Sequence, residues 1–291
     1  MLWENLREEE FPFAIERSRG VCCMIIGSLE KHGQHLPVGC DTQKGGKILE
    51  LAAEQEEAVV FPRFYFGDMA PNHSMFASQT QYGSIALSTR LLFDLLDELC
   101  DEIARNGFHK ILLFSSHGGN TALLSQYVRH AVHTRKSYLV YYGHNKLVMP
   151  PELLKIVQER GRDAFPMLTD DDMSTLRSYT EQKKTGGHAC FGETALMLGT
   201  YPHLVHLERM YENDGHSRHR VDHLTKAGLD WGLKWYANFP DAYSGDHPDG
   251  CTQSIGEACV KIAVERAATM IRVLKTETET ETIHRELSTL S

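Results

Sequence analysis

Four short apolar runs stand in the first half of the chain, each bounded by polar or turn-forming residues. A strand that is covered on both faces is apolar at successive positions rather than at alternate ones. The runs therefore predict buried strands at residues 21–26, 58–61, 110–114 and 138–142. Gly27-Ser28 ends the first of them, and a polar segment from Glu30 to Asp41 follows.

Stretches with apolar residues three and four positions apart separate these runs and predict amphipathic helices. The clearest one spans 89–106, where Leu92, Leu96 and Leu99 share a face and Asn106-Gly107 gives a natural stop. Asn120 is expected to cap the helix that runs to about residue 133. Further helices are predicted at 46–54, 151–160, 193–198, 222–236 and 254–274.

The alternation of strands and helices predicts the α/β class, with a mostly parallel sheet covered on both faces. The 291 residues suffice for one large domain, and the sequence contains no internal repeat and no clear linker. We therefore expect a single domain over residues 1–275. Residues 276–291, in which Thr and Glu alternate at first, are expected to form a polar, solvated C-terminal tail.

Charge and cysteine content narrow the class of protein. A formal net charge of −9 argues against a nucleic-acid partner, because phosphate binding requires a basic patch. No apolar run approaches the ~20 residues that a membrane-spanning helix needs, and the N-terminus lacks the basic-then-apolar order of a signal peptide. Seven cysteines without framework spacing indicate reduced thiols, and so a cytoplasmic protein without a membrane partner.

The segment after the first predicted strand carries side chains that bind metals. It reads Gly-Ser-Leu-Glu-Lys-His-Gly-Gln-His-Leu-Pro-Val-Gly-Cys-Asp over residues 27–41. Ligands of α/β proteins bind at the carboxyl ends of strands, where this segment starts. Glu30 and His32 project to the same side of an extended segment, and glycines allow a turn that returns Asp41. Imidazole and carboxylate together suit zinc, manganese or iron. A polar surface loop is the alternative.

Two later segments add similar side chains. His117 follows the third predicted strand within Ser-His-Gly-Gly-Asn, a pattern that also fits an anion-binding helix N-terminus. His188 and Glu193 lie within Gly-His-Ala-Cys-Phe-Gly-Glu-Thr. The helix dipole would also explain Glu193, since it stands at the start of a predicted helix. Two strand ends that both deliver metal-binding side chains make a metal site the better hypothesis.

In this order the three segments resemble the creatininase-like amidohydrolase family. The chain carries Gly-Ser-x-Glu-x-His-Gly-x-His-Leu-Pro-x-x-x-Asp, then His-Gly-Gly-Asn, then His-Ala-x-x-x-Glu-Thr. Weaker matches stand at residues 72–73, 83–85 and 245–248, so that the resemblance covers roughly 21–265. It implies a three-layer α/β/α sandwich around a mostly parallel central sheet.

The resemblance also implies a site with two divalent metal ions, which would be zinc, manganese or iron. Glu30, Asp41 and His117 would hold one ion. His32 and Asp41 would hold its neighbour, with Asp41 bridging the two.

Two positions depart from creatininase itself. Creatininase gives a glutamate to the second ion where this chain has Gly119, so Glu193 is the candidate for the missing carboxylate. Creatininase also covers its substrate with a tryptophan just before the position of His188, where this chain has no tryptophan. The chain is therefore similar to the His-Gly-Gly-Asn variants of the family, and creatinine is not the expected substrate.

The implied reaction is hydrolysis of a C–N bond in a small cyclic amide or a formamide by a metal-activated water. His188 is the predicted acid/base that carries a proton to the leaving nitrogen, and Glu193 counts among both the catalytic residues and the ligands.

Two other interpretations remain open: hydrolysis of a cyclic ketone such as an oxidised inositol, and a non-catalytic metal- or ligand-binding protein. Relatives form ring-like hexamers, which implies a homo-oligomer.

Several further residues of these segments are not predicted to bind the metal. His35 is expected to support the ligands rather than to join them. His216, His219 and His223 are expected to lie in a solvated segment, and Cys22-Cys23 in the core.

Overall fold

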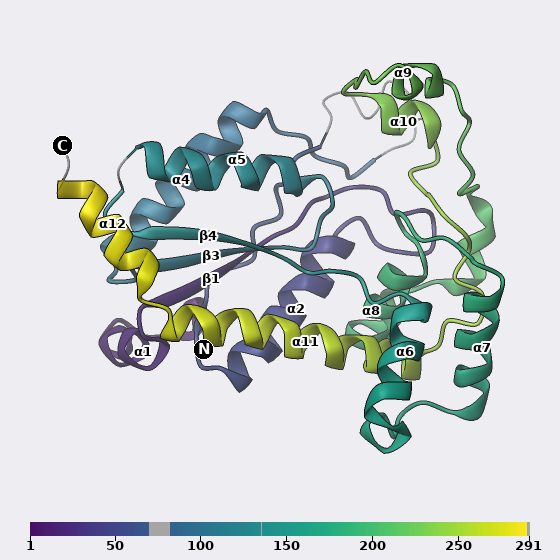
Figure 1. Cartoon of the computed structure of the whole chain (residues 1–291), viewed down its shortest axis with the longest axis horizontal. Coiled ribbons are helices and arrows are strands. Elements are labelled where there is room, and N and C mark those ends of the chain that lie inside the picture. Colours follow the sequence, from purple (N-terminus) through teal and green to yellow (C-terminus); the bar gives the residue numbers. More distant parts are fainter. Residues whose placement is uncertain (70–81, 135, 290–291) are drawn as a thin grey trace.

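The structure of this protein, a computed structural model, describes residues 1–69, 82–134 and 136–289. Strands and helices alternate along its first half, and the described second half is mainly helical (Figure 1). The strands are β1 (Val21–Ile26), β2 (Val59–Val60), β3 (Lys110–Ser115) and β4 (Leu139–His144). The helices are α1 (Phe11–Ser18), α2 (Cys40–Gln55), α4 (Thr89–Arg105), α5 (Asn120–His133), α6 (Pro150–Arg160), α7 (Asp170–Glu181), α8 (Phe191–Thr200), α9 (Asp222–Lys226), α10 (Lys234–Asn238), α11 (Gln253–Thr276) and α12 (Glu279–Thr289).

The four strands form one parallel sheet in the order β2-β1-β3-β4. Ile25 of β1 pairs with Phe114 of β3, and Ser115 pairs with His144 of β4. The carboxyl ends of β1, β3 and β4 therefore meet at one edge. The predicted parallel α/β sheet is confirmed, and β2 is shorter than the strand predicted at 58–61.

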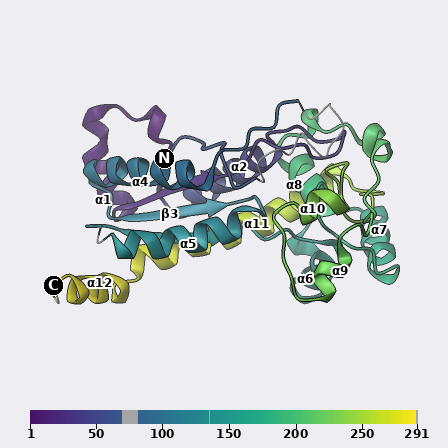
Figure 2. The same cartoon turned by 90° about the horizontal axis from the view of Figure 1, so that it is seen from above.

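Helices cover both faces of this sheet, which gives the predicted three layers (Figures 1 and 2). Side chains of β1 alternate between the two faces. Met24 and Ile26 pack with Leu96 of α4 in one buried cluster. Ile25 packs with Ile48 of α2 in a second cluster, which also contains residues of α8 and α11. Because both faces are buried, every position of β1 is apolar, as the run in the sequence predicts.

Two glycines allow α8 and α11 to cross at close range. A Cβ atom on Gly256 of α11 would lie 2.4 Å from the carbonyl oxygen of Ala195 and 2.5 Å from the amide nitrogen of Gly199. Any larger residue would push the two helices apart. The contact fixes α8 against the long helix α11, and Glu193 stands in the first turn of α8.

Two predicted details near the strand ends are wrong. Helix α2 begins at Cys40 rather than at residue 46, so Asp41 lies in its first turn. Asn120 does not cap α5, because the N-cap is Gly119. The Asn120 side chain instead donates to the carbonyl oxygen of Ile26 over 3.0 Å and accepts from the amide of Asp68 over 2.8 Å. It satisfies buried backbone groups between the ends of β1 and β3, which outweighs capping.

The second half departs further from the prediction. The single helix predicted at 222–236 is two short helices, α9 and α10, separated by a segment that contains Gly228 with φ +75°. Helices α1 and α7 were not predicted. The polar residues after 275 include α12, a helix whose Thr280 hydroxyl bonds to Tyr141 of β4 over 2.6 Å. The weak match at 72–73 lies outside the described residues. None of the described helices is long and apolar enough to cross a membrane.

Candidate metal centre

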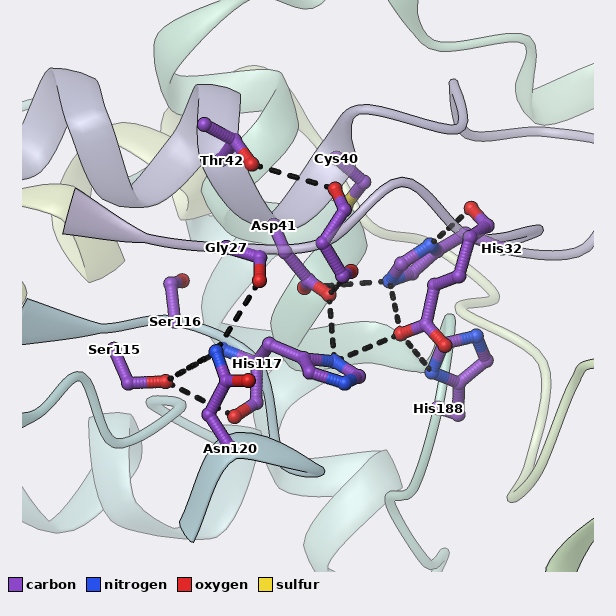
Figure 3. Close-up of polar contacts among 12 residues, drawn as sticks. Gly27, His32, Cys40, Asp41, Thr42, Ser115, Ser116, His117, Asn120 and His188 are labelled. Carbon is purple, nitrogen blue, oxygen red and sulfur yellow. Dashed lines mark hydrogen bonds and ion pairs between the residues drawn. The ribbon is translucent and has the colours of Figure 1, made fainter. Parts of the chain in front are cut away.

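The six side chains that the sequence singles out lie together beyond the carboxyl ends of β1 and β3. They are Glu30, His32, Asp41, His117, His188 and Glu193. Figure 3 shows His32, Asp41, His117 and His188 pointing toward one another. Five of them are buried, and the side chain of His188 is 15% exposed. Such a group of charged side chains is rarely buried unless its charges are paired or bind a metal.

One trio has the geometry of a metal site. The Nδ1 atom of His117 lies 2.9 Å from Glu30 Oε1 and 3.0 Å from Asp41 Oδ2. The other ring nitrogen, Nε2, lies 2.9 Å from the carbonyl oxygen of Asp68 and must donate to it. In the neutral ring, Nδ1 therefore has a free lone pair that faces two carboxylate oxygens. The lone pair and the two carboxylate oxygens repel one another, whereas a cation between them would be bound by all three atoms.

His32 is oriented in a similar way. Its Nδ1 atom lies 3.1 Å from the carbonyl oxygen of Glu30 and donates to it. Its Nε2 atom lies 3.3 Å from Asp41 Oδ1, 3.8 Å from Glu30 Oε1 and 3.7 Å from Glu193 Oε2. A histidine whose second nitrogen is fixed by a backbone carbonyl is the usual arrangement of a metal-binding imidazole.

The protonation of the centre follows from this crowding. Burial alone would raise the pKa of Glu30, but the charge and the hydrogen bond of His117 outweigh it and hold the pKa below its usual range. Burial would likewise raise the pKa of Asp41, and Lys44 and His32 hold that pKa well below its usual range. Both carboxyls are therefore ionised at neutral pH. Burial would lower the pKa of His32 and of His117, but the anionic groups around them outweigh it and raise both pKa values well above the usual one. The centre therefore attracts positive charge, which protons on these two rings or a divalent ion would supply.

Two buried atoms of the centre lack a hydrogen-bond partner, namely Glu30 Oε1 and His32 Nε2. Buried polar atoms are nearly always satisfied, so such atoms call for an explanation such as an ion. Among the described residues, the convergent groups able to hold a metal are Glu30-Asp41-His117, Glu30-His32-His188 and His32-Cys40-Asp41. The first group fits the ion that the sequence predicts for it.

The expected second ligand set fits less well, because Lys44 stands among its members. This lysine is fully buried, and its Nζ atom bonds to Asp41 Oδ1 and, over 3.0 Å, to Glu193 Oε1. The other oxygen of Glu193 accepts from the amide of Ala189 over 2.6 Å. Glu193 belongs to none of the convergent groups of described residues. Its carboxylate is thus satisfied without an ion.

Gly119 leaves no room for the glutamate that creatininase has at this place. A Cβ atom on Gly119 would lie 2.5 Å from His117 Nε2 and 2.5 Å from the carbonyl oxygen of Asp68. A side chain there would disturb the hydrogen bond that orients the His117 ring. The observed orientation of the His117 ring therefore requires a glycine at position 119.

His188 borders a cavity of about 510 Å³. Its Nε2 atom donates to the carbonyl oxygen of Lys31 over 2.8 Å, and its Nδ1 atom lies 3.6 Å from Glu30 Oε1. Burial, together with the nearby His32, lowers the pKa of His188, so the ring is neutral at neutral pH. The Trp235 ring makes a T-shaped contact with His188, at 5.1 Å between centroids, and lines the same cavity.

His35, His216 and His219 lie where the sequence predicts. His35 is buried, its Nε2 atom bonds to Thr194 Oγ1 over 3.0 Å, and burial and His32 lower its pKa to about 4. It therefore supports α8 as a neutral ring and belongs to none of the convergent groups. His216 and His219 are exposed and pair with neighbouring aspartates. All seven cysteines are free and buried.

Three residues that shape the centre were not predicted from the sequence. Lys44 follows Asp41 by one helical turn, and this spacing was the available signal. Asp68 orients His117 through its backbone, and Trp235 reaches the cavity from a distant part of the chain. Neither has a local pattern that points to the site.

Known proteins resemble this chain in sequence and in fold. Residues 4–271 match the family model of creatininase, described as creatinine amidohydrolase. The creatinine amidohydrolase of Pseudomonas putida is 20% identical over 215 residues, which cover 72% of this chain and 75% of that protein.

Solved creatininase structures have the same fold. A zinc–zinc form of a creatininase variant superposes with a TM-score of 0.68 at 19% identity, over 95% of this chain and 98% of that one. A manganese form superposes with a TM-score of 0.64 at 18% identity, over 95% and 99%.

Proposed function

Because this chain belongs to the creatininase family of amidohydrolases, we propose that it is a metal-dependent hydrolase of non-peptide C–N bonds. The observation that supports this most is the trio of Glu30, Asp41 and His117. Their ligand atoms converge, and the hydrogen bond from His117 to a carbonyl oxygen leaves its other nitrogen free for an ion.

The chain offers this ion three protein ligands and access from the cavity. Zinc, manganese and iron all suit such a set of imidazole and carboxylate ligands. When bound, the ion supplies Lewis acidity and lowers the pKa of a water molecule. Ser28 holds Asp41 in place through a hydrogen bond of 2.7 Å to Oδ2. Asp68 and Ser28 thus orient two of the three ligands.

His188 is the residue that we assign to proton transfer. It borders the cavity, it is neutral, and its free Nδ1 atom faces the centre. A neutral imidazole there can take a proton from the attacking water and release it to the leaving nitrogen. The hydrogen bond to the Lys31 carbonyl holds the ring in this orientation.

The cavity indicates a small substrate. Its volume of about 510 Å³ falls in the range of small-molecule sites. Trp235 lines the cavity with an apolar ring, and Glu30, His117 and His188 of the centre line it with polar groups. A cyclic amide or a formamide carries a planar C–N bond of suitable size. A homo-oligomer and a cytoplasmic location stay predictions of the sequence.

The sequence also predicts a second ion, held by His32, Asp41 and Glu193. The positions of Lys44 and Glu193 do not fit that ion. The proposed activity requires only the ion of Glu30, Asp41 and His117.

The test combines metal analysis with a substrate panel. Protein purified without chelator and reconstituted with zinc should retain the metal after desalting and hydrolyse a member of a panel of cyclic amides and formamides. His117→Ala should lose both the zinc and the activity, since it removes a ligand. His216→Ala is the matched control, because that ring is exposed and pairs with Asp214, outside the centre. Zinc-free wild-type protein after reconstitution would refute the proposed function.

A further inference from the structure

Lys44 has an unusual position for a lysine. It stands on α2 one turn after Asp41, and its side chain is fully buried beside the centre. A buried ammonium group is stable only where carboxylates or other acceptors pair with it. Here Asp41 Oδ1 and Glu193 Oε1 both accept from Nζ, and Cys40 Sγ lies 3.5 Å away.

Asp41 Oδ1 and the carboxylate oxygens of Glu193 are also the atoms that would have to bind a second divalent ion. We propose that the Lys44 ammonium group takes the place of this second ion, so that the chain binds one divalent ion per subunit. This inference rests on the proposed function, since it assigns the remaining ion to Glu30, Asp41 and His117.

Ligand geometry on the Glu193 side supports the proposal. The ligand atoms of one zinc ion lie about 2.1 Å from it, and so within roughly 4.2 Å of one another. Glu193 is absent from the groups of described residues whose ligand atoms lie within 4.8 Å of one another. Lys44 joins the carboxylates of Asp41 and Glu193 without bringing them that close.

The buried atoms that lack a hydrogen-bond partner also support the proposal. Both oxygens of Glu193 have hydrogen-bond partners, Lys44 and the Ala189 amide. The two buried atoms of the centre without a partner are Glu30 Oε1 and His32 Nε2, and His32 Nε2 lies at similar distances from Glu30 Oε1, Asp41 Oδ1 and Glu193 Oε2. The carboxylate oxygen that still needs a cation therefore belongs to Glu30, whereas Lys44 already pairs with Asp41 Oδ1 and Glu193 Oε1.

The charges of the centre balance with one ion. Glu30, Asp41 and Glu193 carry three negative charges, and Lys44 carries one positive charge. One divalent ion makes this set neutral when the imidazoles are uncharged. Two divalent ions would leave an excess of positive charge in a buried place beside an ammonium group, which is unfavourable.

The test counts zinc ions bound per chain, by elemental analysis after desalting and by calorimetric titration of metal-free protein. Wild type should bind one equivalent. Lys44→Met removes the ammonium group from a side chain of similar length and should bind two. Lys47→Met is the matched control, because Lys47 is a partly exposed lysine on the same helix, and it should bind one.

A second variant keeps the test decisive if Lys44→Met does not fold, which circular dichroism would reveal. Glu193→Gln should still bind one zinc ion with an affinity within about threefold of wild type, because Glu193 is not a ligand of that ion. Two equivalents in wild type, or one in folded Lys44→Met, would overturn the inference and leave the proposed function intact. Zinc-free wild type would overturn both.

Discussion

Three imidazoles of the centre share one arrangement. In His32, His117 and His188, one ring nitrogen donates to a backbone carbonyl oxygen and the other faces a carboxylate. The backbone therefore selects the tautomer of each ring. Because the fixed nitrogen differs, Nδ1 in His32 and Nε2 in the other two, the free nitrogens all point inward from different elements.

His188 differs from the other two rings in its exposure to the cavity, and this difference leads to a prediction. His188→Gln should keep the zinc content of wild type and lower kcat by about 10²–10⁴, because it removes the group that moves the proton. Zinc analysis and steady-state kinetics on the same preparation check both statements. His219→Gln, which alters an exposed ring, should change neither.

Two other outcomes of that experiment would change the role assigned to His188. If His188→Gln loses zinc, His188 is a ligand, as the convergent group Glu30-His32-His188 would allow. If it keeps both zinc and full turnover, the role in proton transfer is wrong.

Which site residues the sequence could predict depends on how they are connected. Glu30, His32 and Asp41 lie in one segment, and His117 follows a strand parallel to the first, so their convergence follows from the sheet topology. Lys44 could be placed near Asp41 by helical spacing, but its pairing with Glu193, 149 residues away, could not. Trp235 reaches the cavity through loops, whose paths are not fixed by any periodic pattern.

At the scale of elements, the predictions succeed where burial alone decides the structure. β1 is apolar throughout, β3 is apolar between Lys110 and Ser115, and both are covered on both faces, so their limits were predicted to within one residue. α9 and α10 have only five residues each, and Gly228 at φ +75° interrupts the pattern that predicted one helix. α7 was missed because its sequence is rich in Asp, Ser and Thr and has few apolar residues.

The start of α7 is held by a buried carboxylate that also reaches α11. Asp172 Oδ2 accepts from the Thr169 amide and the Ser254 hydroxyl, each over 2.7 Å, and Oδ1 accepts from the Thr252 hydroxyl over 2.6 Å. Burial alone would raise the pKa of Asp172, but these hydrogen bonds outweigh it and hold the pKa below its usual value. The ionised carboxylate thus ties the beginnings of two helices together.

Asp172→Asn should therefore lower the free energy of unfolding by about 1–3 kcal/mol at pH 7, since hydrogen bonds to a charged group are lost. The folded-state pKa is depressed, so the contribution is present above the unfolded pKa of ~3.9 and disappears as pH falls through the folded pKa. Urea unfolding at pH 7, 4 and 3 should show the difference between variant and wild type shrinking at the lowest pH. An equal difference at all three would contradict this account. Asp170→Asn, an exposed change in the same turn, is the control.

At the scale of the whole molecule, the two ends of the parallel sheet have separate roles. The carboxyl ends of β1 and β3 carry the candidate metal centre, and α8 closes it. Figure 1 shows α12 at the other end, beside the starts of β3 and β4. There Lys110 Nζ pairs with Glu281 over 2.9 Å, and His284 Nε2 donates to the Lys136 carbonyl oxygen over 2.8 Å.

This separation predicts that stability and metal binding respond differently to the loss of α12. Deletion of residues 278–291 should lower the free energy of unfolding by about 1–3 kcal/mol, because the contacts to Tyr141, Lys110 and Lys136 disappear. The bound zinc should not change, since no ligand atom lies near α12. Urea unfolding and zinc analysis measure the two effects. In the full-length chain, Thr280→Val removes the bonds of one hydroxyl, to Tyr141 and to Glu277, and should cost a fraction of that energy. Unchanged stability after deletion would mean that the tail is solvated, as its composition predicts, whereas loss of zinc from a folded truncation would mean that the two ends of the sheet are coupled.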